Sequence, residues 1–346
     1  MELEKNTQLN GCYLQGDIDM MKAIVCTKYG APDVLQLQEV EKPVPASNEV
    51  LIKVHTATAT AASVIGRIGK PYFVRLFFGF TKPRKTILGQ ELAGEIEAVG
   101  SDVKSFKVGE KVFGLTGMEL GAYAQYKCMN KNSALTSMPQ NATFGESAAI
   151  VEGGLTALNF LKHRADIQEG QHIVIYGASG SVGTASIQVA KAFGAKVTAI
   201  CSSANFDLVK SLGADLVIDY QQEDFTENES TYDIIFDTVG KLSFSRCKNS
   251  LTPTGIYLDA DGLGTIFPMM WTSFFGGRRA ILATTYTRSA EVNLADLETL
   301  KTFFEQGSFR AVIDERYALA DLASAYEYVE TGRKKGNLVI NISHDK

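Results

Sequence analysis

The stretch from His172 to Gly194, HIVIYGASGSVGTASIQVAKAFG, decides the fold. An apolar run is followed by three glycines, Gly177, Gly180 and Gly183, and then by an amphipathic segment that ends at another glycine. A buried strand, a tight turn and a helix in this order are typical of a dinucleotide-binding βαβ unit. In such a unit the first glycine permits the turn, the second leaves room for a pyrophosphate, and the third lets helix and strand pack closely.

The spacing of the glycines is G-x-x-G-x-x-G, which is a variant of the usual pattern, and a tight turn without a ligand is the alternative reading. The complete strand, turn and helix context favours the ligand, because free N–H groups at a helix N-terminus bind phosphate. We therefore predict that the whole turn contacts the cofactor, through Gly177, Ala178, Ser179, Gly180, Ser181, Val182 and Gly183.

Short apolar strands and helical stretches alternate on both sides of this turn. The strands KVTAIC, DLVID, YDIIFDTV, GIYLDA and AILATTY follow at similar spacing, and nearly all of their residues are apolar. Strands of this kind are buried on both faces of a parallel sheet, which predicts a doubly wound α/β domain. Ligands bind at the carboxyl edge of such sheets, so Val239 and Gly240, which close the fourth strand, are predicted cofactor contacts.

The end of the second strand indicates which dinucleotide is bound. An NAD-selecting fold places Asp or Glu about 20 residues after the glycines, where it holds the ribose 2′-OH. Here Ser202, Ser203 and Asn205 are neutral, which favours NADPH over NADH. Tyr220 and Arg333 are further candidates to contact the adenosine end of the cofactor. The alternative for Arg333 is that its basic run simply faces solvent.

The composition of the chain limits its domain number, its partners and its location. The chain has 346 residues and a net charge of −5, which suits two domains and gives no basic footprint for nucleic acid. No apolar run reaches the ~18 residues that membrane insertion needs. Five scattered cysteines form no C-x-x-C pair, so we expect free thiols and a cytoplasmic location. Residues 1–20 lack an apolar stretch and are predicted to be a flexible extension rather than a signal peptide.

Residues 21–147 are β-rich, with short strands such as NEVLIKVHTATA between glycines and prolines, and they predict a compact β-barrel-like domain. The motifs MKAIV, NEVLIKV, LGQELAGEIEAVG, FKVGEKVFG, GAYAQY, GLTALNFL, GASGSVG, SLGADLVIDY and FDTVG run through the chain. Together they resemble the medium-chain dehydrogenase/reductase superfamily, and within it the zinc-free, NADPH-dependent quinone oxidoreductase branch.

This resemblance covers essentially residues 21–342 and implies the domain organisation. A GroES-like β-barrel catalytic domain is expected over residues 21–147 and 288–346, and a Rossmann NADP-binding domain over residues 148–287. The family fold places the active site in the cleft between them, with Thr156 near the nicotinamide, and it implies a homodimer.

The resemblance also locates a metal position that this chain has changed. Zinc-dependent relatives hold a catalytic zinc with two Cys and one His, and the matching residues here are Thr60, Gln90 and Glu152. Hydroxyl and amide groups are poor zinc ligands, so no metal is expected. These three residues either orient substrate or water, or satisfy each other in a filled pocket. Quinone reductases often carry N-x-x-D at the Thr60–Ser63 stretch, and its replacement here leaves the substrate class open.

Without a Lewis acid, hydride must go to an acceptor that is already electrophilic. The resemblance therefore implies an NADPH-dependent reductase of quinones or α,β-unsaturated carbonyls. Arg67 and Tyr72 lie in GRIGKPY, where relatives carry substrate-side residues; Tyr72 would stack on or protonate the acceptor, or is an exposed loop aromatic. The alternatives are an enoyl reductase acting on a carrier- or CoA-linked substrate, and a catalytically weak dinucleotide-binding sensor or RNA-binding protein.

Overall fold

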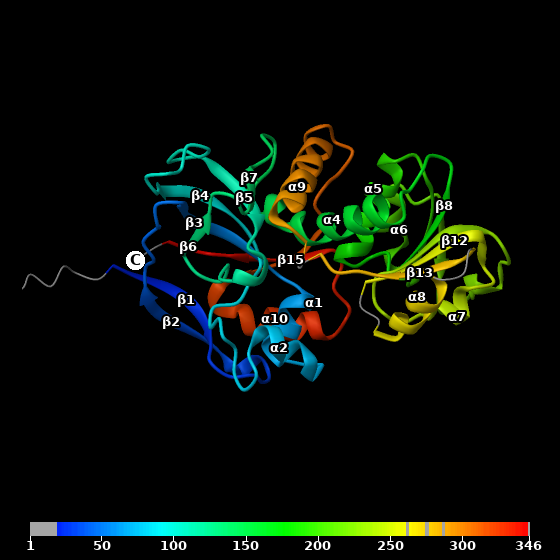
Figure 1. The fold of residues 1–346 in the computed structure, drawn as a ribbon, viewed down its shortest axis with the longest axis horizontal. Coiled ribbons are helices and arrows are strands. Elements are labelled where there is room, and N and C mark those ends of the chain that lie inside the picture. The colour runs from blue at the N-terminus through cyan, green and yellow to red at the C-terminus, as the bar shows by residue number, and fades with distance from the viewer. Residues whose placement is uncertain (1–18, 261–262, 274–276, 286–287, 345–346) are drawn as a thin grey trace, which may run out of the picture.

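The computed structural model describes residues 19–260, 263–273, 277–285 and 288–344 (Figure 1). Two sheets lie side by side, one built from both ends of the chain and the other from its middle. The predicted fold class is confirmed, since a β-barrel-like domain is joined to a doubly wound parallel sheet. The predicted N-terminal extension lies outside the described residues up to residue 18, and the first strand begins at Met20.

The mostly antiparallel sheet has the order β14-β15-β3-β4-β5-β7, with β6 also paired to β3, and β1 and β2 form a separate hairpin. Val50, Ile52 and Val54 of β3 alternate along the strand and are fully buried in the core of the barrel. The strands are β1 (Met20–Cys26), β2 (Leu35–Glu41), β3 (Glu49–Ala59), β4 (Glu91–Val99), β5 (Lys111–Leu115), β6 (Tyr126–Asn130) and β7 (Ala134–Ser137). The helices of this part are α1 (Ala61–Ile68), α2 (Arg75–Phe78) and α3 (Phe144–Ala149).

The second sheet is parallel throughout, with the order β10-β9-β8-β11-β12-β13. The strand order reverses between β8 and β11, which makes this the topological switch point where ligands bind in such sheets. Its strands are β8 (His172–Tyr176), β9 (Lys196–Cys201), β10 (Leu216–Asp219), β11 (Tyr232–Asp237), β12 (Leu251–Asp259) and β13 (Arg279–Leu282). Its helices are α4 (Val151–Leu158), the π-helix η4 (Asn159–Arg164), α5 (Ser181–Ala192), α6 (Phe206–Ser211), α7 (Phe244–Cys247) and α8 (Ile266–Thr272).

The last part of the chain returns to the first sheet. Strand β15 (Asn337–Asn341) pairs antiparallel with β3 and parallel with β14 (Ile313–Ala318). Helix α10 (Leu322–Glu330) packs beside α1, and helix α9 (Ala290–Glu305) lies between β7 and α4. Helices α5 and α6 end just before Gly194 and Gly213, whose positive φ angles of 76° and 104° suit glycine caps.

Candidate functional site

The glycine turn follows β8 at the switch point and leads directly into α5. Gly177 has a φ of 79°, a conformation that glycine adopts without strain. A Cβ on Gly183 would lie 2.3 Å from the Gly177 carbonyl oxygen, so only glycine allows helix and strand this close. A Cβ on Gly180 would meet nothing closer than 3.6 Å, so this glycine faces open space at the helix N-terminus. The turn therefore has the three steric properties that the sequence predicted for it.

Val239 lies against the turn from the neighbouring strand end. A Cβ on Gly177 would come within 2.7 Å of the Val239 side chain, so the ends of β8 and β11 meet here. The Val239 N–H donates to Asp237 Oδ1 over 3.0 Å, and Gly240 has a φ of 63°. The structure thus brings Val239 to the glycine turn and leaves its side chain 40% exposed at the carboxyl edge.

A polar cluster joins the turn to the end of β9. Asn205 Nδ2 donates to Ser179 Oγ over 3.0 Å and to Ser202 Oγ over 3.3 Å, whereas Asn205 Oδ1 is buried without a hydrogen-bond partner. An Asn amide can exchange its oxygen and nitrogen by rotation without changing shape. In the rotated form, the serine hydroxyls donate to the Asn205 oxygen, and its NH₂ group is free to donate to a phosphate.

An acid lies near this cluster, on the next strand. Asp219, at the end of β10, is paired in register with Cys201, and its Oδ2 accepts from the Ser203 backbone N–H over 3.3 Å. Its Oδ1 accepts from the Gln221 N–H over 3.0 Å. Both oxygens are therefore engaged by backbone donors. The following residue, Tyr220, is 51% exposed beside Tyr176, with a distance of 6.4 Å between ring centroids.

The C-terminal loop before β15 closes one side of the glycine turn. The Gly336 N–H donates to the Ser179 carbonyl over 2.8 Å, and Gly336 forms a parallel bridge with Gly180. Ser181 Oγ donates to Asn337 Oδ1 over 2.5 Å. These bonds fix the loop against the first turn of α5, so the last strand of the barrel is tied to the cofactor-side turn.

Lys334 is the basic residue of this loop that turns inward. Its half-buried side chain folds back, and Nζ donates to the Gly336 carbonyl over 2.6 Å. Burial lowers the pKa of Lys334, while the negative charges of Glu152 and Asp314 oppose that shift. Arg333, the predicted contact, is instead exposed to solvent, with its N–H bonded to Thr331 Oγ1. Lys334 is thus the member of the basic run that turns inward, and the contact of Arg333 with the adenosine end stays a prediction.

Glu91 is a fully buried carboxyl group at the start of β4. Its Oε2 accepts from Thr58 Oγ1 over 2.7 Å, and its Oε1 has no hydrogen-bond partner. Burial, reinforced by the charge of Glu152, raises the pKa of Glu91 to about 8. A neutral, protonated Glu91 is therefore the favoured form at neutral pH. Glu152 is half-buried and interacts electrostatically with both Glu91 and Lys334.

Thr60 and Gln90, the other two residues at the predicted metal position, are buried with only 2% and 3% of their surface exposed. Thr60 is the N-cap of α1, where its Oγ1 accepts from the Ser63 N–H over 3.3 Å and lies 2.8 Å from Ser63 Oγ. The two hydroxyls that replace the N-x-x-D side chains thus bond to each other and to the helix end. The carbonyl of Gln90 accepts from the Thr116 N–H over 2.7 Å.

These residues do not fit a catalytic zinc. A hydroxyl, an amide and one carboxylate replace the thiolates and imidazole that zinc prefers. Within the described part of the chain, no three His, Cys, Asp or Glu residues come together in a way that could hold a metal ion.

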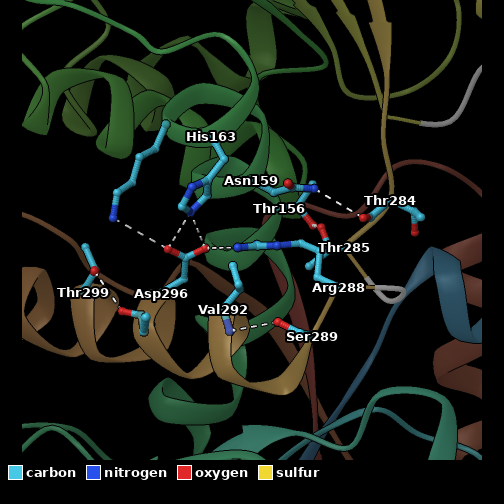
Figure 2. A network of polar contacts seen from close by, with 12 residues as sticks. Thr156, Asn159, His163, Thr284, Thr285, Arg288, Ser289, Val292, Asp296 and Thr299 are labelled. Atoms are coloured by element: carbon cyan, nitrogen blue, oxygen red, sulfur yellow. Dashed lines mark hydrogen bonds and ion pairs between the residues drawn. The ribbon is translucent and has the colours of Figure 1, made fainter.

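Thr156 lies on α4, which packs against α5. Its Oγ1 is 3.2 Å from Thr285 Oγ1, and Asn159 Nδ2 donates to the Thr284 carbonyl over 3.4 Å (Figure 2). The segment that leaves β13 is therefore held beside α4. The Thr156 side chain is 8% exposed.

The same segment is anchored further along by a buried carboxylate on α9. Asp296 is 1% exposed and contacts three cationic or titratable groups, as Figure 2 shows. Its oxygens lie 2.5 Å from Arg288 Nη2, 2.9 Å from His163 Nε2 and 3.8 Å from Lys162 Nζ. Asp296 thus joins α9, η4 and the segment after β13.

Arg67 does not lie on the substrate side, contrary to the prediction. Its side chain is fully buried, and Nη1 donates to the Gly30 carbonyl over 2.7 Å, while Nη2 forms an ion pair with Glu330. Its guanidinium also lies 5.5 Å from the ring centroid of Tyr326. These contacts occupy the charged group between α1 and α10, so Arg67 has a structural position.

Tyr72 is 67% exposed on a short 3₁₀ turn, η2 (Tyr72–Val74), as both predicted readings require. Its ring lies near the cations of Arg75 and Lys70, at 4.9 Å and 5.8 Å. Tyr123 is fully buried, and its hydroxyl donates to the Thr58 carbonyl over 2.8 Å.

Thr285 and Asn337 carry no sequence signal that would have singled them out as residues of the site. Lys334, Thr285 and Asn337 reach the turn or α4 from segments more than a hundred residues away along the chain. Only Lys334 belonged to a motif that the sequence drew attention to, the basic run. Glu91 carried a signal of its own, because a carboxyl group directly follows Gln90 in an apolar strand.

Known protein families and curated proteins are similar to this chain along most of its length. Residues 46–140 match the family model described as alcohol dehydrogenase GroES-like domain, and residues 212–340 match the one described as zinc-binding dehydrogenase. The chain is 32% identical over 333 residues to a 2-methylene-furan-3-one reductase from Solanum lycopersicum, covering 93% of this chain and 79% of that protein. It is 27% identical over 325 residues to the quinone oxidoreductase of Homo sapiens, covering 90% and 95%.

The fold agrees with that of a solved relative. The structure of the quinone oxidoreductase from Coxiella burnetii superposes with a TM-score of 0.84 at 29% identity, covering 94% of this chain and 100% of that chain. Both halves of the chain, the glycine turn and the matched families point to one conclusion. The chain belongs to the medium-chain dehydrogenase/reductase superfamily, in its quinone oxidoreductase-like branch.

Proposed function

We propose that this protein is an NADPH-dependent oxidoreductase that reduces quinones or α,β-unsaturated carbonyls without a metal ion. The observation that carries the proposal is the donor set at the metal position of the family, where Thr60, Gln90 and Glu152 replace zinc ligands. Oxidation of an alcohol needs a group that ionises the hydroxyl, whereas an electrophilic acceptor needs none. The names of the relatives, a quinone oxidoreductase and a furanone reductase, support the same acceptor class.

The residues of the cofactor side fit a dinucleotide phosphate. Gly180 leaves an open space at the N-terminus of α5, which is the usual place for a pyrophosphate. Ser179, Ser202 and Asn205 would hold the 2′-phosphate, because a rotated Asn205 amide would place an NH₂ donor where its unpaired oxygen now lies. Ser203 and Tyr220 would border the adenosine, and Thr156 and Val239 would border the nicotinamide.

The cofactor supplies the hydride, and the chain supplies position and electrostatics. Glu91 is held protonated by burial, which keeps a second negative charge away from Glu152. Lys334 offsets the charge of Glu152 from the C-terminal loop. A site with little net charge admits an apolar acceptor without the cost of desolvating an unpaired ion. Solvent can protonate the reduced product.

The test of this proposal is NADPH consumption against a panel of quinones, enones, enoyl-CoA thioesters and alcohols. Turnover with quinones or enones and none with alcohols is expected. Activity on enoyl thioesters alone would favour an enoyl reductase. NADPH binding without turnover on any acceptor would favour the catalytically weak sensor.

Gly180→Ala tests the cofactor position separately from folding. A Cβ at this residue meets nothing closer than 3.6 Å, so the free protein should keep its thermal stability. If the pyrophosphate lies over Gly180, the methyl group displaces it, and NADPH should bind at least about tenfold more weakly. Unchanged NADPH affinity in a normally folded variant would contradict the placement.

Asn205→Asp tests the choice of dinucleotide. A carboxylate at this position would repel a 2′-phosphate and accept from a 2′-OH, so the preference should move toward NADH. The change is measured as the ratio of kcat/KM for NADPH and NADH. Asn132→Asp, on an exposed turn after β6, is the matched control and should leave the ratio unchanged.

We also propose that the protein is a homodimer and that it works in the cytoplasm. Strand β13 is the edge of the parallel sheet, and α8, which packs beside it, exposes Phe267 and Trp271 at 82% and 69%. An open strand edge with apolar side chains beside it favours self-pairing. Analytical ultracentrifugation tests the dimer, and Trp271→Glu should produce monomers if this edge is the interface. Among the described residues, no helix is both long and apolar enough to cross a membrane.

A further inference from the structure

Large apolar side chains gather on one short, solvent-facing segment of the barrel domain. The segment consists of η2, α2 and the two residues that follow, at the lower edge of Figure 1. We call its exposed side chains the aromatic face. Their exposed fractions are 67% for Tyr72, 46% for Phe73, 63% for Leu76, 61% for Phe77 and 74% for Phe80.

The local structure presents these side chains outward as a set. Tyr72, Phe73, Leu76 and Phe77 recur at helical spacing along η2 and α2, and Phe80 follows the helix after Gly79. On the other side, Val74 is buried and Phe78 packs against the core of the barrel. The segment is also fixed from beneath, because Tyr29 Oη donates to the Gly79 carbonyl over 2.6 Å and Arg75 Nε donates to the Gly69 carbonyl over 2.9 Å. An apolar face that is held toward solvent in this way marks an interaction surface.

The stretch of chain that carries the aromatic face contains charged residues of a single sign. Residues 61–90 contain six of the 34 Lys and Arg residues of the chain and none of its 39 Asp and Glu residues. Lys70, Lys82, Arg84 and Lys85 are exposed, and among them Lys85 forms an ion pair with Glu119. This basic surface belongs to a protein whose net charge is −5, so the charge is concentrated locally.

Aromatic and leucine side chains surrounded by Lys and Arg are the composition of segments that lie in a membrane interface. We propose that the aromatic face docks this protein onto an anionic lipid surface. The apolar side chains enter the boundary between headgroups and acyl chains, and the surrounding cations contact lipid phosphates. The segment lies on the bilayer and does not span it.

Charge argues against a second copy of the chain as the partner. In a symmetric dimer through this face, Lys82 and Arg84 would meet the same cations of the other copy, and like charges across an interface are unfavourable. The inference does not depend on the proposed reductase activity, although a lipid surface is where apolar acceptors concentrate.

Vesicle flotation with the full chain tests the proposal. We expect binding to mixed phosphatidylcholine–phosphatidylglycerol vesicles, little binding to phosphatidylcholine alone, and weaker binding at high salt. Phe77→Ser/Phe80→Ser should lower the partition coefficient at least about tenfold, because two aromatic rings no longer leave water. Lys82→Glu/Arg84→Glu should lower the partition coefficient to a similar extent. This second variant tests the proposal independently if Phe77→Ser/Phe80→Ser folds poorly.

The controls are Val44→Ser, which replaces another apolar side chain that is 85% exposed, and Lys107→Glu, an exposed cation elsewhere on the barrel domain. Both should bind vesicles as the wild type does. The proposal is overturned if the wild type does not bind anionic vesicles, or if the controls lose as much binding as the variants of the aromatic face. It is also overturned if Phe77→Ser/Phe80→Ser changes the sedimentation mass and leaves vesicle binding intact.

Discussion

Replacement of Glu91 by Gln should remove a pH dependence of stability that the wild type carries. Glu91 is fully buried, and its pKa is raised from 4.5 to about 8 in the folded chain. Between these two pH values the folded protein keeps the proton and the unfolded chain releases it. The unfolded state then binds fewer protons, so the free energy of unfolding falls as the pH rises from 4.5 to 8.

The raised pKa also sets the size of the effect. Each unit of pKa difference corresponds to about 1.4 kcal/mol, so the full difference amounts to at most about 5 kcal/mol. Over the two units between pH 5 and pH 7, the wild type should lose about 2–3 kcal/mol through this group. The glutamine of Glu91→Gln cannot ionise, and its amide can still bond to Thr58. The variant should therefore lack this slope and be the more stable protein at pH 8.

The assay is urea unfolding of both proteins at a series of pH values between 5 and 8. Titrating groups that do not interact with Glu91 contribute equally to both proteins, so the difference between their free energies of unfolding isolates Glu91 and its interaction with Glu152. Glu119→Gln is the control, because Glu119 is exposed beside Lys85 and its pKa is lowered, which places its titration below this range. Equal pH slopes for the wild type and Glu91→Gln would refute the reasoning.

Two further substitutions follow from close packing and from buried charge. Gly183→Ala would place a methyl group 2.3 Å from the Gly177 carbonyl oxygen, so it should destabilise the protein by about 1–3 kcal/mol and weaken NADPH binding. Thermal unfolding measures the first effect and fluorescence titration the second. An unchanged melting temperature would contradict the contact. Asp296→Asn leaves Arg288 without its counter-charge in the interior, so the free energy of unfolding measured in urea should fall by about 3–5 kcal/mol. Glu119→Gln breaks an exposed ion pair and should lower the free energy of unfolding by less than about 1 kcal/mol. Similar costs for these two variants would show that the Asp296 network contributes little.

The sequence predicted those features that depend on short stretches of chain. The roles of Gly177 and Gly183 follow from steric contacts among neighbours in sequence, and these contacts are present. The position of Arg67 could not be predicted in the same way, because its partner Glu330 is 263 residues away. The inward turn of Lys334 depends on the docking of the C-terminal loop against the glycine turn, which no local pattern encodes.

The electrostatic relation of Glu91 to Glu152 was likewise beyond the sequence. The two residues are on a barrel strand and on a helix of the other half of the chain, and only the fold brings their charges near. The family resemblance identified Gln90 and Glu152 as positions to compare. It gave no reason to expect that the carboxyl group beside Gln90 would be the one with the perturbed pKa.

The return of β15 to β3 has a consequence for how the chain is made. On the ribosome, the residues of the parallel sheet are complete well before Asn337 emerges, so the cofactor domain can fold while the chain is still growing. The barrel cannot, because β15 lies between β3 and β14 in the sheet and is synthesised after all the other strands that the structure describes. Residues 56–59 of β3 must therefore remain without their strand partner until residues 338–341 have been synthesised. A chain that stops before β15 would keep a complete parallel sheet and an open barrel, so completion of the barrel depends on this single strand.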